Sequence, residues 1–420
     1  MSEVRVDAAE NLFRFLRGFQ RRHVVAQRDE RSAHSDEDLG RGLGVHPSDH
    51  RFELLGHGNR AAIAGPVFRH GVPQTLSWTN PYLAPVRAIR FQPGGVVELV
   101  DLPTPEPAEG EVLVRVAAAG VCRTDLHLLK EVASGERAPL VPGHETAGTV
   151  QKIGPGVGRV RAGDQVVVHF ELPCGKCRSC IQKRTNLCTQ GAALGFSVPG
   201  AYAEYVHVPE DVVLAAPRNL EPEAAATLAC SGATAYHTVV TLGGADERDV
   251  VAVIGSGGVG LSAVQVAKAR GAAVVAVDPR EEAREAAKRV GADEVATPEE
   301  ALAAILGASK DRGADLVVDL VSTGEAMQLG LAALGPGGRL VEVAPGGEGI
   351  SVSPSLLMEK EITLVGAHSS TMADFARAVD LAEARLLKPV VARTAPLADA
   401  ESVLRALENG EIVGRAVLRP

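Results

Sequence analysis

The stretch "DVVAVIGSGGVGLSAVQVAKAR", residues 249–270, decides the fold of this chain. An apolar run leads into four glycines within residues 255–260, and a second apolar run ends at Lys268 and Arg270. Residues 250–267 carry no charge and are long enough to be considered as a membrane span. The central glycines and the basic residues at the end favour a buried strand, a glycine turn and a helix instead.

The glycines follow the pattern G-x-G-x-x-G of dinucleotide-binding turns. Gly255 permits the tight turn, Gly257 lets the backbone approach a pyrophosphate, and Gly260 lets the helix pack closely on the strand. The N–H groups at the start of the helix then face the phosphates. The sequence therefore predicts a cofactor site that includes Gly255, Gly257, Gly258, Val259 and Gly260.

The next apolar run, residues 272–278, ends at Asp278, 23 residues after Gly255. A carboxylate at this place accepts hydrogen bonds from the adenosine ribose hydroxyls and would repel the 2′-phosphate of NADP. We therefore predict NAD as the cofactor. Arg280 lies close enough to take part in cofactor binding, and it keeps NADP open as the alternative.

The pattern of strands and helices predicts two kinds of sheet. Apolar runs at 249–256, 272–278, 314–321 and 338–344 alternate with helical patterns at 258–270, 280–290 and 324–333. This alternation is typical of a doubly wound parallel sheet covered on both faces. Between Val86 and about residue 220, short β-rich runs separated by Gly and Pro predict a mostly antiparallel, barrel-like region. The tail, 367–420, is expected to hold one helix and two short strands that return to that region.

The bulk composition excludes several classes of partner. The formal net charge of the 420-residue chain is −9 and no basic stripe is visible, which argues against nucleic-acid or membrane-surface binding. The N-terminus shows no secretory signal, so a cytoplasmic location is expected. Residues 1–85 contain no lysine, and the first is Lys130. We interpret them as an extension of uncertain order, or as a segment outside the natural protein, which would then start at Val86.

Four of the six cysteines lie close together, at positions 174, 177, 180 and 188. In a chain without a signal peptide, this favours metal binding over disulfides. The spacing C-x2-C-x2-C-x7-C lets Cys174, Cys177, Cys180 and Cys188 close a tetrahedral, structural zinc site. An iron–sulfur cluster is the rival, but the bacterial ferredoxin run has three residues before its last cysteine and then a proline. Spacing alone cannot assign the two remaining cysteines, Cys122 and Cys230.

Several motifs together resemble the zinc-dependent alcohol dehydrogenases of the medium-chain dehydrogenase/reductase family, in particular their bacterial and archaeal NAD-dependent branch. They are "GVCRTDLH" at 120–127, "PGHETAG" at 142–148, the four-cysteine lobe, "CSGATAY" at 230–236, "GSGGVG" at 255–260 and "IVGRAVL" at 412–418. The resemblance runs from about residue 86 to 420 and does not include the first 85 residues.

The resemblance implies an α/β fold built from two domains. A GroES-like, mostly antiparallel catalytic domain would comprise 86–231 and 367–420, with the structural-zinc lobe near 171–190. A Rossmann domain at 232–366 would bind NAD. The family also implies a homotetramer or homodimer.

The resemblance further implies a catalytic zinc held by Cys122, His144 and Cys230, with water or substrate as the fourth ligand. Near the zinc, the resemblance implies that Thr124 contacts the alcohol through its hydroxyl, Asp125 orients the ligand histidine and Glu145 lies close behind the metal. His127 would relay the proton to solvent, and Phe170 would form an aromatic wall of the substrate pocket. At the cofactor, Arg123 and Arg415 would bind the pyrophosphate, and Thr234 would lie beside the nicotinamide.

The expected activity is zinc-assisted hydride transfer between an alcohol and NAD, which gives an aldehyde or a ketone. A polyol, sugar or amino-alcohol dehydrogenase on the same scaffold is one alternative, since the pocket decides the substrate. A noncatalytic zinc- and NAD-binding redox sensor is the other. The relay residues Thr124 and His127 argue against the sensor, which would not need them.

Overall fold

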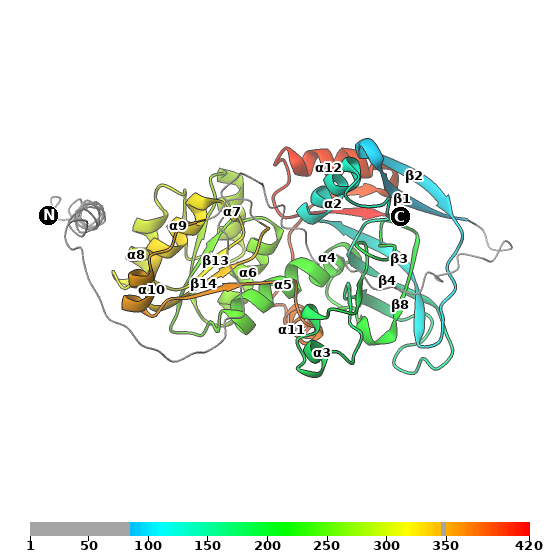
Figure 1. The fold of residues 1–420 in the computed structure, drawn as a ribbon, viewed down its shortest axis with the longest axis horizontal. Helices are drawn as coiled ribbons and strands as arrows, with labels where there is room; N and C mark the ends of the chain where they lie inside the picture. The colour runs from blue at the N-terminus through cyan, green and yellow to red at the C-terminus, as the bar shows by residue number, and fades with distance from the viewer. Residues whose placement is uncertain (1–84, 346–349) are drawn as a thin grey trace, which may run out of the picture. The chain divides into compact units, whose positions relative to one another are not determined.

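The computed structural model describes residues 85–345 and 350–420 (Figure 1). The interpretation of residues 1–85 as an extension lies, except for Pro85, outside the described residues. The first part contains β1 Val86–Gln92, η1 Pro93–Gly95, β2 Val96–Leu102, β3 Glu111–Val121, α2 Arg123–Ser134, β4 Glu145–Ile153, β5 Gln165–Val168, β6 Glu171–Leu172, α3 Arg178–Ile181, η2 Thr185–Leu187, β7 Ala192–Ala193, β8 Tyr205–Pro209, η3 Glu210–Val212 and β9 Val213–Ala215.

The second part begins with a nearly continuous helical run and continues into alternating strands and helices. It contains α4 Pro222–Thr227, η4 Leu228–Gly232, α5 Ala233–Tyr236, η5 His237–Leu242, β10 Val250–Ile254, α6 Gly258–Ala269, β11 Ala273–Val277, α7 Glu281–Arg289, β12 Glu294–Ala296, α8 Ala301–Ser309, β13 Ala314–Asp319, α9 Gly324–Ala333, β14 Leu334–Glu342, α10 Pro354–Lys360, β15 Thr363–Gly366, α11 Met372–Glu383, β16 Val391–Pro396, η6 Leu397–Asp399, α12 Ala400–Glu408 and β17 Arg415–Arg419.

The first large sheet has seven strands and is mostly antiparallel. Its strand order is β16-β17-β3-β4-β5-β9, and β8 also pairs with β3. The long strand β3 pairs antiparallel with β4, β8 and β17, and only β16 and β17 are parallel to each other. The register places Ala416 of β17 opposite Val121 of β3. The last strand of the chain therefore lies beside the residue that precedes Cys122.

The second large sheet has six strands, and every strand pair in it is parallel. The strand order β12-β11-β10-β13-β14-β15 is the doubly wound order, in which the chain first builds outward from β10 and then crosses to its other side. All five residues of β10 are buried, as expected for a strand covered on both faces. The predicted fold class is confirmed: an antiparallel β region joined to a Rossmann-type parallel sheet.

The helical run from α4 to η5 packs with both sheets. One apolar cluster contains Val167 from β5, Leu228 from η4, Ala233 from α5 and Val253 from β10. The η4 segment, which contains Cys230, is a π-helical turn. Such turns are uncommon and often occur at functional sites. No helix among the described residues is both long and apolar enough to cross a membrane.

The expected content of the tail is corrected in one respect. The predicted helix is present as α11, and the two strands are present as β16 and β17, but the tail also holds a second helix, α12. Val403, Leu404 and Leu407 of α12 are buried, and they recur at a spacing typical of one helical face. The helical spacing of these apolar residues is present in the sequence "AESVLRALE". The helix is short, however, and no side-chain N-cap hydrogen bond marks its start.

The packing of α12 predicts how strongly the tail contributes to stability. Leu404 is 2% exposed in the core of the antiparallel region, so Leu404→Ala should lower the free energy of unfolding by about 2–5 kcal/mol. Glu401→Ala, on the exposed face of the same helix, removes only a surface ion pair with Arg405 and should cost less than about 0.5 kcal/mol. Urea unfolding of both variants tests this. Equal losses would contradict the burial of α12.

Candidate metal and cofactor site

The candidate metal site begins where β3 ends and α2 starts. Cys122 precedes the first residue of α2, and its N–H donates to Oδ2 of Asp125 at 2.8 Å. This bond closes the first turn of the helix and fixes the backbone at Cys122. The Oγ1 atom of Thr124 lies 3.5 Å from the Cys122 sulfur.

Asp125 is fully buried and connects Cys122 to the histidine of the next loop. Its Oδ1 lies 3.3 Å from Nδ1 of His144, and its Oδ2 accepts a hydrogen bond from the Tyr202 hydroxyl at 2.9 Å. A carboxylate on Nδ1 leaves Nε2 of an imidazole for a metal. Sequence reasoning missed Tyr202 because it lies 77 residues away from Asp125 in the chain.

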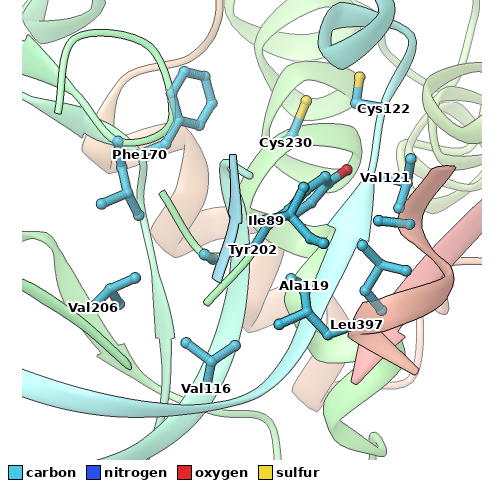
Figure 2. Packing of buried hydrophobic residues seen from close by; sticks show 14 of the residues in the cluster. Ile89, Val116, Ala119, Val121, Cys122, Phe170, Tyr202, Val206, Cys230 and Leu397 are labelled. Carbon is cyan, nitrogen blue, oxygen red and sulfur yellow. The ribbon is translucent and has the colours of Figure 1, made fainter. Parts of the chain in front are cut away.

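Cys230 reaches the same place from the π-helical turn η4. Figure 2 shows the sulfurs of Cys122 and Cys230 on the same side of the buried core. The ligand atoms of Cys122, His144, Glu145 and Cys230 all lie within 4.8 Å of one another. The structure thus brings together the three expected zinc ligands and places Glu145 beside them.

Arg415 provides the positive charge at this site. Its Nε donates to Oε1 of Glu145 at 2.9 Å, and its terminal nitrogen lies 3.6 Å from the Cys122 sulfur and 3.9 Å from the Cys230 sulfur. Both partners of the ion pair are buried. Strand pairing places Glu145 opposite Gly120, where a Cβ atom would lie 2.1 Å from Oε2 of Glu145, so only glycine leaves room for the carboxylate.

A shared hydrogen bond shifts the proton affinities of Cys122 and Cys230 in opposite directions. A hydrogen bond from the Cys230 thiol and the positive charge of Arg415 hold the pKa of Cys122 well below its usual range, although burial opposes this. A thiolate is the form of cysteine that binds zinc. Burial raises the pKa of Glu145 to about 7. The same hydrogen bond to Cys122, together with burial, raises the pKa of Cys230.

The donor set fits a zinc ion that keeps one position open. Two sulfurs and one imidazole suit zinc, and three protein ligands are typical of catalytic sites. The Oε2 atom of Glu145 is buried and has no hydrogen-bond partner among the described residues, so a cation beside it would satisfy it. No disulfide links the six cysteines, so both sulfurs of this group are available.

The remaining residues of the "GVCRTDLH" motif lie around the candidate zinc site. Thr124 is partly buried, whereas Arg123 and His127 are exposed on α2. Phe170 contacts the ring of His144 edge-on, with centroids 5.2 Å apart. Phe196 lies at the same distance from His144 and stacks on Phe170. Phe196 was not predicted, because an aromatic in a loop carries no signal of its own.

The glycine turn has the geometry expected of a pyrophosphate site. Gly255 adopts a φ of +97°, which favours glycine. A Cβ atom at Gly257 would meet nothing within 4 Å, so this side of the turn is open, whereas one at Gly260 would lie 1.9 Å from the Gly255 carbonyl oxygen. A Cβ atom at Gly258 would lie 2.4 Å from a guanidinium nitrogen of Arg415. Arg415 therefore contacts both the turn and the metal group.

Asp278 and Arg280 form a pair after β11. Nε and a terminal nitrogen of Arg280 donate to the two carboxylate oxygens of Asp278 at 3.0 and 3.1 Å, and the Ser256 N–H donates to Oδ2 at 2.9 Å. Burial raises the pKa of Asp278, but the hydrogen bonds from Arg280 and Ser256 together outweigh burial, so the pKa lies below its usual value.

Thr234 lies buried in α5, one turn after Cys230. Val259 packs partly buried in α6.

The four-cysteine lobe is compact. Sulfur–sulfur distances are 4.0 Å for Cys174–Cys180, 3.6 Å for Cys177–Cys180 and 3.8 Å for Cys177–Cys188. A tetrahedral site with Zn–S bonds of about 2.3 Å separates the sulfurs by about 3.8 Å. Backbone N–H groups, that of Cys180 foremost, lower the pKa of Cys177 to about 6, which favours the thiolate. The lobe therefore fits a closed zinc site.

Two protein families match this chain. Residues 108–218 match the alcohol dehydrogenase GroES-like domain, and residues 258–384 match the zinc-binding dehydrogenase family. Among curated relatives, the NAD-dependent alcohol dehydrogenase of Sulfurisphaera tokodaii is 36% identical over 347 residues, which cover 80% of this chain and all of that protein. The L-threonine 3-dehydrogenase of Pyrococcus horikoshii is 35% identical and covers 67% of this chain and 82% of its own length.

A solved structure leads to the same group of proteins. The cobalt- and zinc-bound thermostable alcohol dehydrogenase of Pyrobaculum aerophilum superposes with a TM-score of 0.70 at 35% identity, over 80% of this chain and all of that one.

The lobe geometry predicts the effect of removing one of its thiolates. Cys177→Ser should lose one zinc per chain and lower the thermal unfolding midpoint, because a closed metal site contributes folding energy. Metal analysis and thermal unfolding of purified protein test this. A Cys177→Ser variant that kept two zincs per chain and an unchanged midpoint would contradict a zinc site in the lobe.

Proposed function

The chain belongs to the zinc-dependent alcohol dehydrogenases of the medium-chain dehydrogenase/reductase family, and on that premise we propose how its residues act. It is an oxidoreductase enzyme that uses NAD and zinc, as the sequence predicted. Its reaction transfers a hydride between an alcohol and NAD and gives an aldehyde or a ketone. Because the members of this family are enzymes, catalysis is favoured over the noncatalytic redox sensor.

Cys122, His144 and Cys230 would hold the catalytic zinc, and Cys174, Cys177, Cys180 and Cys188 the structural one. When bound, zinc supplies a Lewis acid for the substrate oxygen, and NAD supplies the hydride acceptor. Asp125 keeps His144 in the tautomer that presents Nε2, since its Oδ1 lies 3.3 Å from Nδ1. Arg415 favours the thiolate at Cys122 through its positive charge.

The proton of the alcohol would be transferred by two residues of α2, Thr124 and His127. The Thr124 hydroxyl, next to the Cys122 sulfur, would accept this proton at the buried end and release its own toward the solvent end. His127 is exposed on the same helix and would serve as the base at the solvent end. Phe170 forms an apolar wall that excludes water from His144. Glu145, adjacent to the ligand atoms, is available to assist ligand exchange.

NAD would bind along the carboxyl edge of the parallel sheet. Gly255, Gly257, Gly258, Val259 and Gly260 would hold the pyrophosphate with Arg123 and Arg415, Asp278 would accept the adenosine ribose hydroxyls, and Thr234 would lie beside the nicotinamide. Arg280 would share Asp278 with the ribose. The observation that carries the proposal is Arg415, which contacts both the zinc ligands and the glycine turn.

An amino alcohol is the second candidate substrate. It is favoured by the match to a protein named L-threonine 3-dehydrogenase. Polyols and sugars remain in the same group of alternatives.

The domain limits proposed from the sequence are 86–231 with 367–420 for the catalytic domain and 232–366 for the NAD-binding domain. A homotetramer or homodimer in the cytoplasm is the proposed state.

A panel of substrates tests the proposed reaction. Purified protein with two zincs per chain should reduce NAD in the presence of at least one primary, secondary, aromatic, polyol or amino alcohol, with NAD preferred over NADP because of Asp278. NADH absorbance gives the rate. Absence of NAD reduction across the whole panel would contradict the assignment, and a preference for NADP would contradict the role of Asp278.

The same replacement at the other metal group should have the opposite effect from that in the lobe. Cys122→Ser removes one of three ligands at an open site, so turnover should fall by orders of magnitude while the thermal midpoint stays close to that of the wild type. Cys177→Ser is the matched control. If Cys122→Ser unfolded the chain or kept normal turnover, the proposed catalytic site would be wrong.

A further inference from the structure

Two carboxyl groups lie side by side at the carboxyl edge of the parallel sheet, away from the metal ligands. Asp319 is the last residue of β13 and Glu342 the last residue of β14, and the strand register pairs them directly. On its other side Asp319 is paired with Ile254, which precedes Gly255. The two carboxyls are therefore close to the glycine turn, at the edge where doubly wound folds bind their ligands.

If both are ionised, the carboxyl groups of Asp319 and Glu342 leave buried oxygens without a hydrogen-bond donor. Oδ1 of Asp319 accepts from the N–H groups of Val321 and Ser322, and Oε1 of Glu342 accepts from the N–H of Val343. The other oxygens, Oδ2 of Asp319 and Oε2 of Glu342, are buried and have no hydrogen-bond partner among the described residues. Two ionised carboxylates could not satisfy one another, because both only accept.

Ser322 adds to the shortage of protons. Its hydroxyl lies 2.6 Å from the carbonyl oxygen of Ala344 and also contacts Oε1 of Glu342. A hydroxyl carries one hydrogen and cannot donate to both acceptors. One further proton between Oδ2 of Asp319 and Oε2 of Glu342 would pair these two unpartnered oxygens. It belongs on Glu342, because the two backbone N–H groups bound to Asp319 favour its ionised form.

The proton affinities agree with this arrangement. Burial foremost, and then the charge of Asp319, raise the pKa of Glu342 to about 7. Burial also raises the pKa of Asp319, whereas its hydrogen bonds to Val321, Ser322 and Glu342 lower it. Among the titratable groups of the described residues, Asp319 acts on Glu342, and the residue opposite Glu342 on β15 is Gly366.

The loop held by this cluster packs on the dinucleotide turn. A Cβ atom at Gly255 would lie 3.0 Å from Cγ2 of Val321 and 3.4 Å from Cβ of Leu320. Ser322 has a φ of +59°, a conformation that a residue other than glycine keeps only when its surroundings hold it there. The hydrogen bond from the Ser322 N–H to Asp319 and the contacts of its hydroxyl with Glu342 and Ala344 supply that restraint.

We propose that Glu342 is a positioning residue, whose carboxyl proton is shared with Asp319 and holds the loop 320–322 against the glycine turn for NAD binding. Loss of the proton leaves two adjacent carboxylates that repel each other and release Ser322. A group that must be protonated favours binding below its pKa, and the benefit is lost as the pH rises through it. The inference rests on the use of NAD by this enzyme.

The experiment compares NAD affinity across pH in three forms of the zinc-loaded, full-length protein. For the wild type we expect the Kd for NAD to rise by about tenfold between pH 6 and pH 9, which corresponds to a binding-induced pKa change of about one unit. In Glu342→Gln the side chain is neutral at every pH and its amide donates to Asp319, so this rise should be absent. Glu294→Gln, an exposed glutamate on β12 of the same sheet, is the matched control and should follow the wild type.

Infrared difference spectra of the protein without NAD give a second readout. A band of a protonated carboxyl group should be present at pH 6, disappear as the pH rises through 7 and be missing in Glu342→Gln. Asp319→Asn removes the neighbouring charge and should shift both the band and the affinity profile. Parallel Kd profiles in the wild type and Glu342→Gln, or no such band, would overturn the inference alone, whereas a wild type that bound no NAD at any pH would overturn the enzyme assignment as well.

Discussion

The buried guanidinium of Arg415 is the constraint on which the rest of the site depends. A buried cation is unfavourable unless anions surround it, and here Glu145 and the Cys122 sulfur do so. Its position, in turn, is fixed by the pairing of β17 with β3 at the very end of the chain. The C-terminal strand therefore sets the electrostatics of a candidate metal group whose residues come from the junction of β3 and α2, the loop before β4, and η4. A change that disturbed this strand should alter both the candidate zinc ligands and the glycine turn.

The parts of the fold that the sequence predicts are those with local causes. The glycine turn at 255–260 is local because the positive φ of Gly255 and the close approach of Gly260 to the Gly255 carbonyl oxygen both arise within the motif itself. The four-cysteine lobe is local because its ligands lie within 15 residues. In contrast, α12 was missed because nine residues give too short a periodic signal without a cap.

The partners within the site were harder to predict, because they are distant in sequence. Arg415 and Glu145 are separated by 270 residues, and Asp125 and Tyr202 by 77. No periodicity connects such residues. The resemblance pointed to roles for Arg415, Glu145 and Asp125 but not for Tyr202, and it assigned Arg415 to the cofactor without its contact to the cysteines. The contact of Phe196 with His144 could be identified only from the structure, in which the loop that carries Phe196 lies beside His144.

The acids at the carboxyl edge of the parallel sheet show how a negatively charged ligand can be accommodated there. A pyrophosphate is repelled by carboxylates, yet β11, β13 and β14 each place an acid at or just after their carboxyl end. Asp278 is neutralised by Arg280, and Asp319 is held by two backbone N–H groups. A proton on Glu342 removes the third charge without introducing another cation. The edge can then keep its acids for hydrogen bonding to riboses and loops, while little net negative charge faces the phosphates.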